Sequence, residues 1–501
     1  MTDVLLTHSY HLAYDRKQVR KMQPYPPLGT LYAAAVLRAE GIPVAMFDPM
    51  LDDPVMGFTE ALRRHQPKFV AIYEDDFNFL SKMCLTRMRE LAWNMAQNAR
   101  RFGAMVIAHG SDATDHAAEY LRNGVDVVLT GEAETRLSRL ITTLLGGGDL
   151  GAVEGTVDLH NLNDSSKPKK DSPSLSWSSL PKPARDLIDL EGYRRAWIGA
   201  HGYFSLNMVA SRGCPYRCNW CAKPISGDRF HVRPAVDVAN EICELRDTYQ
   251  ADHIWFGDDV FALNHHWAQQ FASEMEKRRC TVPFKIQSRA DLMTPETVSA
   301  LRRSGCQEVW MGVESGSQKV LDAMDKGLLV SEVMTARKNL RQAGIRACYF
   351  LQFGYPGEGW KEIEQTVALV RETRPDDIGV SLSYPLPNTP FYERVRAELG
   401  YKRNWTDSDD LCVMFQAAYS DRFYRALRDA LHLEVDYYAD LPHRRAMAKR
   451  VRQAWDKVSR LEPSCRNGHA TRLSAQAATA GDVAGTAFVP LSRLSLSTGE
   501  A

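Results

Sequence analysis

The chain has no stretch that predicts a membrane anchor or a secretory signal. No apolar run approaches the roughly 20 residues of a bilayer-spanning helix, and the first residues, MTDVLLTH, put no basic region before an apolar core. Charge of one sign is not in excess, because 62 Lys and Arg residues balance 62 Asp and Glu residues. This balance disfavours a nucleic-acid or anionic-membrane partner. These absences predict a cytoplasmic protein that has no transmembrane segment and binds no nucleic acid.

The sequence has few cysteines outside one short loop. Ten cysteines occur, and without a secretory signal they indicate reduced thiols rather than disulfides. Three of them, Cys214, Cys218 and Cys221, follow the apolar, strand-like stretch 206–210 at C-x3-C-x2-C spacing. The other seven are scattered singly, as core residues are: Cys84, Cys243, Cys280, Cys306, Cys348, Cys412 and Cys465.

The three clustered cysteines favour an iron–sulfur site. Three thiolates on one loop can hold three irons of a 4Fe–4S cluster and leave the fourth iron open to a ligand. A structural zinc ion needs a fourth protein ligand. The nearest candidate, His231, lies ten residues after Cys221 and has no partner at zinc-finger spacing. The spacing therefore favours a cluster over a zinc site or a chance arrangement.

The middle of the chain predicts a barrel. From about residue 205 to 383, short β-rich runs alternate with amphipathic stretches, which is the pattern of parallel strands joined by crossover helices. Six such βα units suit a partial TIM-like barrel, which carries its chemistry at the C-terminal strand ends. The predicted strands are 206–210, 253–257, 284–287, 308–312, 347–352 and 378–383.

Polar and glycine-rich residues follow four of these strands. They are Gly257-Asp258, Gln287-Ser288-Arg289, Gly312-Val-Glu314-Ser315-Gly316 and Gly354-Tyr-Pro356-Gly357-Glu358. In this order, after a cysteine loop with Trp220 before its last cysteine, the motifs resemble the core of radical S-adenosylmethionine (SAM) enzymes over nearly its whole length. The resemblance implies a 4Fe–4S cluster whose open iron binds SAM.

The same resemblance implies which residues contact SAM. Trp220 would contact the adenine, Glu314 and Ser315 the amino group and the ribose, and Arg289 the carboxylate end. It assigns no catalytic acid or base. The Gly354–Gly357 loop, with Gly354 and Pro356, would support the adenine, and further contacts are implied for Gly257 and Asp258.

Residues 1–147 predict a second sheet. Strand-like runs at 4–7, 44–47, 69–73, 105–108 and 125–129 alternate with helical stretches, which suits a doubly wound, Rossmann-like sheet. Three loops resemble the N-terminal domain of cobalamin-dependent radical SAM proteins: Pro26-Pro27-Leu28-Gly29, Gly110-Ser111 and Gly131-Glu132-Ala133-Glu134. The resemblance implies cobalamin contacts from these loops, namely Pro27, Gly29, Gly110, Gly131 and Glu132.

One departure concerns the ligand below the cobalt. Many cobalamin domains carry Asp-x-His-x-x-Gly after the first strand, whereas this chain reads Thr7-His8-Ser9-Tyr10-His11 there. The nearest look-alike, Asp158-Leu-His160, lies in a polar linker and lacks the glycine. We therefore expect no histidine ligand below the cobalt. The alternative is a domain that has lost cobalamin and serves as a lid.

The predicted chain is α/β: a doubly wound cobalamin-type domain, then a partial (β/α)6 TIM-like radical SAM barrel, then a helical C-terminal region. The Ser-, Lys- and Pro-rich segment between the two sheets reads as a linker, and the Ala- and Ser-rich tail predicts disorder. The predicted boundaries are 1–147 for the first domain, 148–195 for the linker, 196–400 for the barrel, 401–464 for the helical region and 465–501 for the tail.

This order of domains resembles the B12-dependent radical SAM methyltransferase class. It implies methylation of an unactivated carbon of a small-molecule, lipid or peptide substrate. The implied cofactors are a 4Fe–4S cluster, SAM and cobalamin, with an electron donor such as flavodoxin or ferredoxin. Because an unactivated C–H bond offers nothing to a general base, the cofactors carry the hard step. Other members of the class cyclise or rearrange their substrates without net methylation.

Two further classes compete with this interpretation. A tRNA methylthiotransferase also joins an N-terminal sheet to such a barrel, but it needs three N-terminal cysteines, and only Cys84 precedes Cys214 here. The other class is a non-catalytic interaction module stabilised by a metal site.

Overall fold

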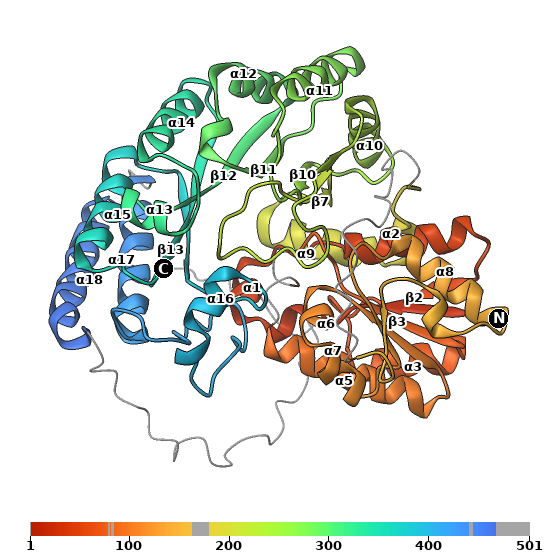
Figure 1. Cartoon of the computed structure of the whole chain (residues 1–501). Coiled ribbons are helices and arrows are strands. Elements are labelled where there is room, and N and C mark those ends of the chain that lie inside the picture. Colours follow the sequence, from red (N-terminus) through yellow and green to blue (C-terminus); the bar gives the residue numbers. More distant parts are fainter. Residues whose placement is uncertain (1, 79–80, 82–84, 163–179, 440–443, 467–501) are drawn as a thin grey trace.

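The computed structural model describes residues 2–78, 81, 85–162, 180–439 and 444–466 of the 501-residue chain. Figure 1 shows three parts: an N-terminal α/β unit, a barrel whose helices form an outer ring, and two long C-terminal helices packed beside the barrel. Cys84, the tail from residue 467 and residues 163–179 of the predicted linker lie outside the described residues. No helix within the described residues is long and apolar enough to cross a membrane.

The N-terminal sheet has the strand order β2-β1-β3-β4-β5-β6. Its first five strands are parallel and β6 is antiparallel to β5. This is a flavodoxin-like order, in which the chain changes direction between β1 and β3 and leaves a crevice at their C-terminal ends. The strands are β1 (Val4–Thr7), β2 (Val44–Met46), β3 (Phe69–Tyr73), β4 (Met105–His109), β5 (Val127–Leu129) and β6 (Thr156–Val157).

Helices cover both faces of this sheet. Buried residues of α2 and α8 pack on one face, and those of α3, α5 and α7 pack on the other. The fully buried strands are almost wholly apolar because both faces are covered. The helices are α1 (Arg16–Lys21), α2 (Leu28–Ala39), α3 (Met56–His65), α5 (Thr86–Arg101), α6 (Ser111–Asp115), α7 (Ala117–Arg122) and α8 (Glu134–Leu145).

The barrel sheet has the order β14-β13-β12-β11-β10-β7, with every pairing parallel. The edge strands β7 and β14 do not pair, so the barrel is partial. Its strands are β7 (Ser205–Met208), β10 (His253–Phe256), β11 (Phe284–Ser288), β12 (Cys306–Glu314), β13 (Arg346–Phe353) and β14 (Asp377–Leu382). A short antiparallel pair, β8 (Ser211–Arg212) and β9 (His231–Val232), flanks the cysteine loop.

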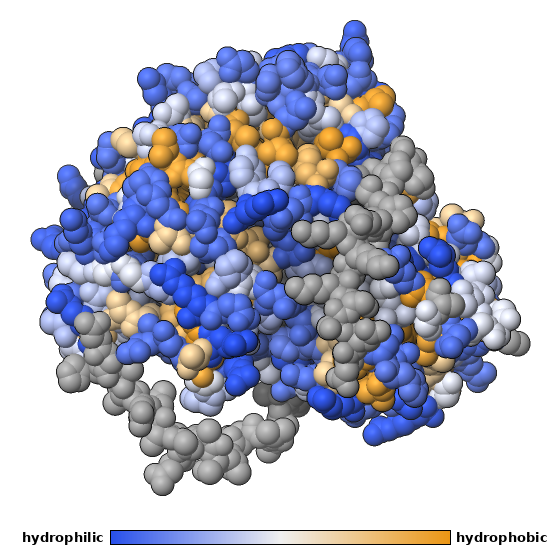
Figure 2. Space-filling view, viewed as in Figure 1, coloured by the Kyte–Doolittle hydropathy of each residue, from blue (hydrophilic) through white to orange (hydrophobic). Residues whose placement is uncertain are grey.

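The outer helices shield one side of every barrel strand. Figure 2 shows that the outer surface of this ring is mostly hydrophilic, with hydrophobic residues gathered nearer the strands. Before and around the barrel lie α9 (Leu190–His201), α10 (Ala235–Asp247), α11 (His265–Arg278), α12 (Pro295–Ser304), α13 (Gln318–Ala323), α14 (Val330–Gln342) and α15 (Trp360–Thr373). The C-terminal helices are α16 (Pro390–Val395), α17 (Asp421–Ala439) and α18 (Arg444–Cys465).

The barrel strands alternate between apolar and polar positions. Residues such as Phe284, Ile286 and Val309 are fully buried against the helices. The alternate residues face the interior, and many of them are polar or charged, unlike the branched apolar layers of a complete TIM barrel. Strand register sets them in layers: Trp255, Lys285, Glu308 and Arg346 near the N-terminal end, then Gln287, Trp310, Cys348 and Asp377.

The structure confirms the predicted fold class. Each predicted strand is present, with ends that shift by at most two residues. Two features differ from the predicted boundaries. The pair Thr156–Val157 joins the N-terminal sheet from within the predicted linker, and α9 begins at Leu190, before the predicted start of the barrel.

Candidate functional site

A single large cavity joins the N-terminal sheet to the barrel interior. Its volume is about 1170 Å³, which exceeds the usual range for one small ligand. The barrel wall contributes inward-facing strand residues and the cysteine loop. The N-terminal unit contributes residues that follow β1, β3 and β4: Tyr10, Leu12, Asp76, Phe77, Asn78, Ser111 and Asp115.

All three clustered cysteines line this cavity. Cys214, Cys218 and Cys221 are half-buried free thiols. The loop starts at a position that requires glycine. Gly213 has φ +82°, and a Cβ built there would clash with the Arg229 carbonyl oxygen at 2.2 Å. Burial raises the pKa of the Cys214 thiol and raises the pKa of Cys221 to about 12, and coordination to iron would stabilise their thiolate forms.

Hydrogen bonds hold the cysteine loop in place, both within the loop and between the loop and α13. Lys223 Nζ donates to the carbonyls of Cys214 and Tyr216 at 3.0 and 2.6 Å, and it pairs with Asp228 at 2.6 Å. Asn219 Nδ2 donates to the Ala323 carbonyl at 2.8 Å, which ties the loop to α13. The backbone around the cysteines is therefore preorganised.

This thiol set suits a cluster better than a single ion. Within the described residues, no three His, Cys, Asp or Glu side chains lie close enough together to hold one metal ion. The ligands of a cubane cluster attach to separate irons and lie farther apart than the ligands of one zinc ion. Trp220, between the second and third cysteines, has a buried indole Nε1 without a protein partner. A polar ligand atom in the cavity would satisfy it.

Glu314 projects a carboxylate into the cavity from the end of β12. It is buried and holds a left-handed conformation with φ +62°, at a register shift between β12 and β13. Lys326 Nζ donates to its Oε1 at 2.8 Å. Gly312 is needed beside them, because a Cβ there would lie 2.7 Å from Oε1 and 2.8 Å from Nζ. A strained acidic residue with one oxygen anchored suits recognition of an ammonium group.

Arg289 and Ser315 are held by protein partners. Arg289 pairs with Asp291 at 2.9 Å, donates to the carbonyls of Lys326 and Gly327 at 3.0 Å each, and lies 3.7 Å from the Tyr216 ring centroid. Arg289 lines the cavity, but most of its donors are engaged. Ser315 Oγ bonds Thr366 Oγ1 at 3.1 Å and is fully buried outside the cavity wall. Their predicted SAM contacts remain predictions.

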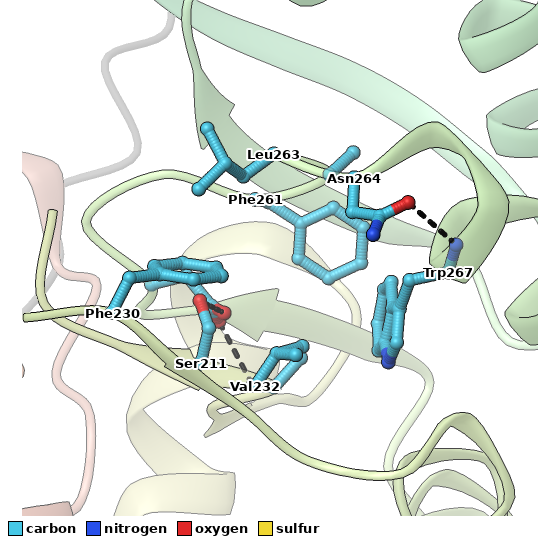
Figure 3. A pocket seen from close by; sticks show the side chains of 10 residues that line it. Ser211, Phe230, Val232, Phe261, Leu263, Asn264 and Trp267 are labelled. Atoms are coloured by element: carbon cyan, nitrogen blue, oxygen red, sulfur yellow. Dashed lines mark hydrogen bonds between the residues drawn. The ribbon is translucent and has the colours of Figure 1, made fainter. Parts of the chain in front are cut away.

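Asp258 supports the start of the cysteine loop from behind. It lies in a small, mostly apolar recess with Ser211, Phe261 and Trp267 (Figure 3), separate from the large cavity. Its carboxylate accepts hydrogen bonds from Ala210 N at 3.0 Å and from Ser211 Oγ at 2.5 Å, and burial raises its pKa to about 7. Its neighbour Asp259 lines the cavity, and a Cβ built on Gly257 would lie 3.5 Å from the Phe77 Cβ of the N-terminal unit.

Glu358 binds the backbone of the Gly354–Gly357 loop, which is predicted to support the adenine. Gly354 has φ +79°, and its N–H donates to Glu358 Oε2 at 2.5 Å. The other oxygen, Oε1, is buried without a hydrogen-bond partner, and burial raises the pKa of Glu358 to about 8. Gly354 and Pro356 lie outside the large cavity's lining. Their contact with adenine remains a prediction.

Glu358→Gln should change how stability depends on pH. The folded carboxyl keeps its proton up to about pH 8, whereas the unfolded one loses it near its ordinary pKa of 4.5. Its contribution to the free energy of unfolding is therefore present below pH 4.5 and falls by up to about 1.4 kcal/mol per pH unit between these values. Urea unfolding at pH 6, 7 and 8 should show a shallower decline for Glu358→Gln than for the wild type.

The matched control is Glu364→Gln, an exposed position on α15, the helix that follows the Glu358 loop. It should keep the wild-type slope. Parallel pH curves for Glu358→Gln and the wild type would contradict the buried, protonated state of Glu358.

The predicted cobalamin loops lie just behind the cavity wall. A Cβ at Gly29 would lie 3.0 Å from Asp76 N, and one at Gly110 would lie 2.7 Å from the Glu74 Cβ, so both glycines permit close packing against the segment after β3. Pro27 caps α2. Gly131 has φ +68°, and the next residue, Glu132, buries its Oε1 without a hydrogen-bond partner. Their cobalamin contacts remain predictions.

Most residues of this unit that line the cavity were not predicted from the sequence. Asp76, Phe77 and Asn78 follow β3, and Asp115 ends α6 after β4, whereas Ser111, the first residue of α6, belongs to the predicted Gly110-Ser111 loop. The available signal was their position, because the crevice of a doubly wound sheet lies beside the strands where the order reverses. Asp76 is also fixed from below, since it pairs with the buried His109 Nε2 at 3.0 Å.

Neither histidine after β1 reaches the cavity. His8 and His11 are both buried. His8 Nε2 pairs with Asp48 at 2.9 Å, and His11 Nδ1 bonds the Pro49 carbonyl at 2.7 Å. Of the described residues that line the cavity, the histidines are His201 and His253, at the barrel end away from the N-terminal sheet. The absence of a histidine ligand below the cobalt remains a prediction.

Residues 208–370 match the family described as the Radical SAM superfamily. The chain contains a radical SAM domain. An uncharacterised methyltransferase of Pyrococcus horikoshii is 24% identical over 76% of this chain and 81% of its own length. The anaerobic magnesium-protoporphyrin IX monomethyl ester cyclase of Synechocystis is 24% identical, over 64% of this chain and 63% of its own length.

One solved structure shares the fold of this radical SAM enzyme across both sheets. It is the radical SAM methyltransferase TsrM of Kitasatospora setae with cobalamin and a 4Fe–4S cluster bound, at a TM-score of 0.68 and 16% identity. The match covers 91% of this chain and all of the other. The family match implies a 4Fe–4S cluster and SAM for this radical SAM enzyme.

Proposed function

We propose that this radical SAM enzyme holds cobalamin and methylates an unactivated carbon of a small-molecule substrate. One observation carries the proposal: a single cavity joins the three-cysteine loop to the crevice of the N-terminal sheet. A substrate carbon in that cavity faces both cofactor sites at once. The first relative's name includes methyltransferase, and a solved methyltransferase with cobalamin bound shares the fold. Lipid and peptide substrates belong to the same proposal.

The residues of the site fit these groups. When bound, the cluster with SAM would supply radical hydrogen abstraction, and methylcobalamin would supply the methyl group. Cys214, Cys218 and Cys221 would hold the cluster, and Glu314 would accept hydrogen bonds from the SAM ammonium. Asp76 would present its carboxylate at the wall where cobalamin would lie.

The rest of the chain orients these groups and excludes water. Lys223 fixes the cysteine-loop carbonyls, and Lys326 fixes the Glu314 carboxylate. Arg217, between the first two cysteines, exposes 83% of its side chain. It pairs with Asp228 at 3.2 Å, and its exposed guanidinium would give an acidic electron donor, such as flavodoxin or ferredoxin, a cationic contact beside the cluster loop.

Anaerobic reconstitution tests the proposal. The reconstituted protein, mixed with hydroxocobalamin and passed through a desalting column, should retain about one cobalamin per chain. After reduction, its EPR spectrum should lack nitrogen splitting from an axial histidine, in the wild type and equally in His8→Ala and His11→Ala. Incubation with methyl-deuterated SAM and a small-molecule extract should then give a product that carries the labelled methyl group.

Two results would contradict the proposal. Failure to retain cobalamin would favour the lid alternative for the N-terminal unit. A product without the label would favour cyclisation or rearrangement, which the cyclase relative makes the second candidate.

Glu314→Gln should weaken SAM binding without loss of iron. The substitution removes the charge that would face the SAM ammonium and leaves Lys326 without its buried partner. A lost charge-assisted hydrogen bond costs about 1.5–3 kcal/mol, so affinity should fall about tenfold to a hundredfold. Equilibrium dialysis with radiolabelled SAM measures the change. Glu332→Gln, at the exposed start of α14, is the control, and an unchanged affinity in Glu314→Gln would show that SAM binds elsewhere.

A further inference from the structure

Cationic side chains gather at the end of the cavity opposite the cysteine loop. Lys285 faces inward from the second position of β11, and Lys17 and Lys21 approach from α1, which lies where the barrel and the N-terminal unit meet (Figure 1). At about 3.3 Å per strand residue, Lys285 lies roughly 13 Å below Arg289. We call Lys17, Lys21 and Lys285 the lysine cluster.

Helix α1 and the segment after it lie at the open side of the partial barrel. The segment after α1 runs along edge strand β7, where Tyr25 OH bonds Ser205 Oγ at 3.1 Å and Asn207 Nδ2 donates to the Pro26 carbonyl at 2.8 Å. Lys21 lies within electrostatic reach of Lys285 and of Asp377, the first residue of the other edge strand. The lysines therefore face one shared end of the cavity.

The carboxylate nearest to Lys285 is already engaged. Glu308 is its register partner on β12, but Glu308 Oε1 accepts from Trp310 Nε1 at 2.7 Å and Oε2 pairs with Arg346 at 2.8 Å. Within the described part of the chain, no member of the lysine cluster forms a side-chain ion pair. The partner of Lys285 is the Tyr25 ring, whose centroid lies 5.8 Å from Nζ.

The electrostatic surroundings agree with a missing anion. Burial lowers the pKa of Lys285 and lowers that of Lys17 to about 8. Burial, with Lys285 nearby, lowers the pKa of His253 in the same wall to about 3. Of the other charged groups at this end, Arg20 pairs with Asp409 at 3.0 Å, and Asp377 accepts a hydrogen bond from Ile378 N at 2.7 Å. Lys17 and Lys285 are half-buried, and Lys21 is exposed. Because partly desolvated ammonium groups without an ion-pair partner are costly, a bound anion would stabilise this end of the cavity.

We propose that the lysine cluster binds an anionic group of the substrate, a carboxylate or a phosphate. The aromatic walls between the two ends would hold the body of an elongated molecule, and its far end would present the reacting carbon near the cysteine loop. This inference rests on the proposed function, because it assumes that the cavity holds the substrate. The wall aromatics at this end are Tyr25, Tyr203, Trp255, Trp310 and Phe350.

Thermal unfolding with simple anions tests the binding site. Sodium phosphate and sodium succinate serve as probes, each compared with sodium chloride at equal ionic strength on the full-length, reconstituted protein. At saturating concentration, at least one probe should raise the Tm of the wild type by about 1–3 °C beyond the chloride effect. The response to each probe distinguishes a phosphate site from a carboxylate site.

Variants locate the effect. Lys285→Met and, independently, Lys21→Met on the surface helix α1 should each weaken probe affinity about tenfold or more, as expected for the loss of a charged partner. Lys338→Met, an exposed lysine of α14, should respond like the wild type. Iron content and SAM affinity should be unchanged in all three variants, which separates this inference from the proposed function.

Failure of the anion site and failure of the proposed function give different results. No stabilisation of the wild type by either probe, or equal stabilisation of Lys285→Met and Lys21→Met, would overturn the anion site. Loss of SAM binding or of cobalamin in the wild type would instead contradict the proposed function, while the anion response would still report on the lysine cluster.

Discussion

Replacement of Cys214, Cys218 and Cys221 by alanine is expected to abolish the iron–sulfur cluster and all SAM cleavage. The three thiols lie on one preorganised loop at the cavity, and a cluster without its thiolate ligands does not stay bound. After anaerobic reconstitution, iron should fall from about four atoms per chain to near zero, and the visible charge-transfer absorption should vanish. Production of 5′-deoxyadenosine should fall below detection.

The control is the double variant Cys243→Ala and Cys412→Ala, which removes two half-buried thiols away from the cavity lining. It should keep its iron and its SAM cleavage. Iron at about four atoms per chain in the triple variant would refute the assignment of the cluster ligands.

Arg212→Met is expected to loosen the N-terminal unit from the barrel. Arg212 lies in β8, just before the cysteine loop, and forms a buried ion pair with Glu134 of α8. Arg212 Nη1 donates a hydrogen bond to Glu134 Oε2 at 3.2 Å. The Arg212 guanidinium also lies 4.9 Å from the Phe77 ring centroid. Removing one member leaves a buried charge without compensation, which typically costs 3–5 kcal/mol. We expect a Tm lower by at least about 5 °C and weaker cobalamin retention.

Lys277→Met is the matched control, because Lys277 pairs with Glu274 on the exposed face of α11. Such surface pairs contribute about 0–1 kcal/mol. If Arg212→Met and Lys277→Met shift the Tm equally, the buried pair does not hold the two units together.

The sequence predicted the sheets because alternation and burial act locally. Strands such as Val4–Thr7 and Phe69–Tyr73 are short apolar runs between turn signals, and the structure has them at the predicted ends. The strand Thr156–Val157 could not be found in this way. It is two residues long and depends on pairing with β5 across the intervening chain.

The cysteine loop was equally predictable, since its chemistry depends on spacing within eight residues. The side chains that hold the site residues in place could not be predicted from the sequence. Lys326 meets Glu314 only after the chain has turned through α13, and Arg212 meets Glu134 from another sheet. The lysine cluster could not be predicted for the same reason. Lys17 and Lys285 are distant in the sequence, and only the folded chain places both in the lining of one cavity.

Alternation along the barrel strands separates the residues that stabilise the fold from the residues that line the cavity and contact its ligands. Outward residues such as Ile286 and Met311 carry the packing, whereas inward residues such as Gln287 and Gln352 touch the cavity and contribute little to the core. Substitutions on the inner face can therefore accumulate during evolution at small cost to folding. The fold can therefore persist while most of the sequence changes, as the fold shared at 16% identity illustrates.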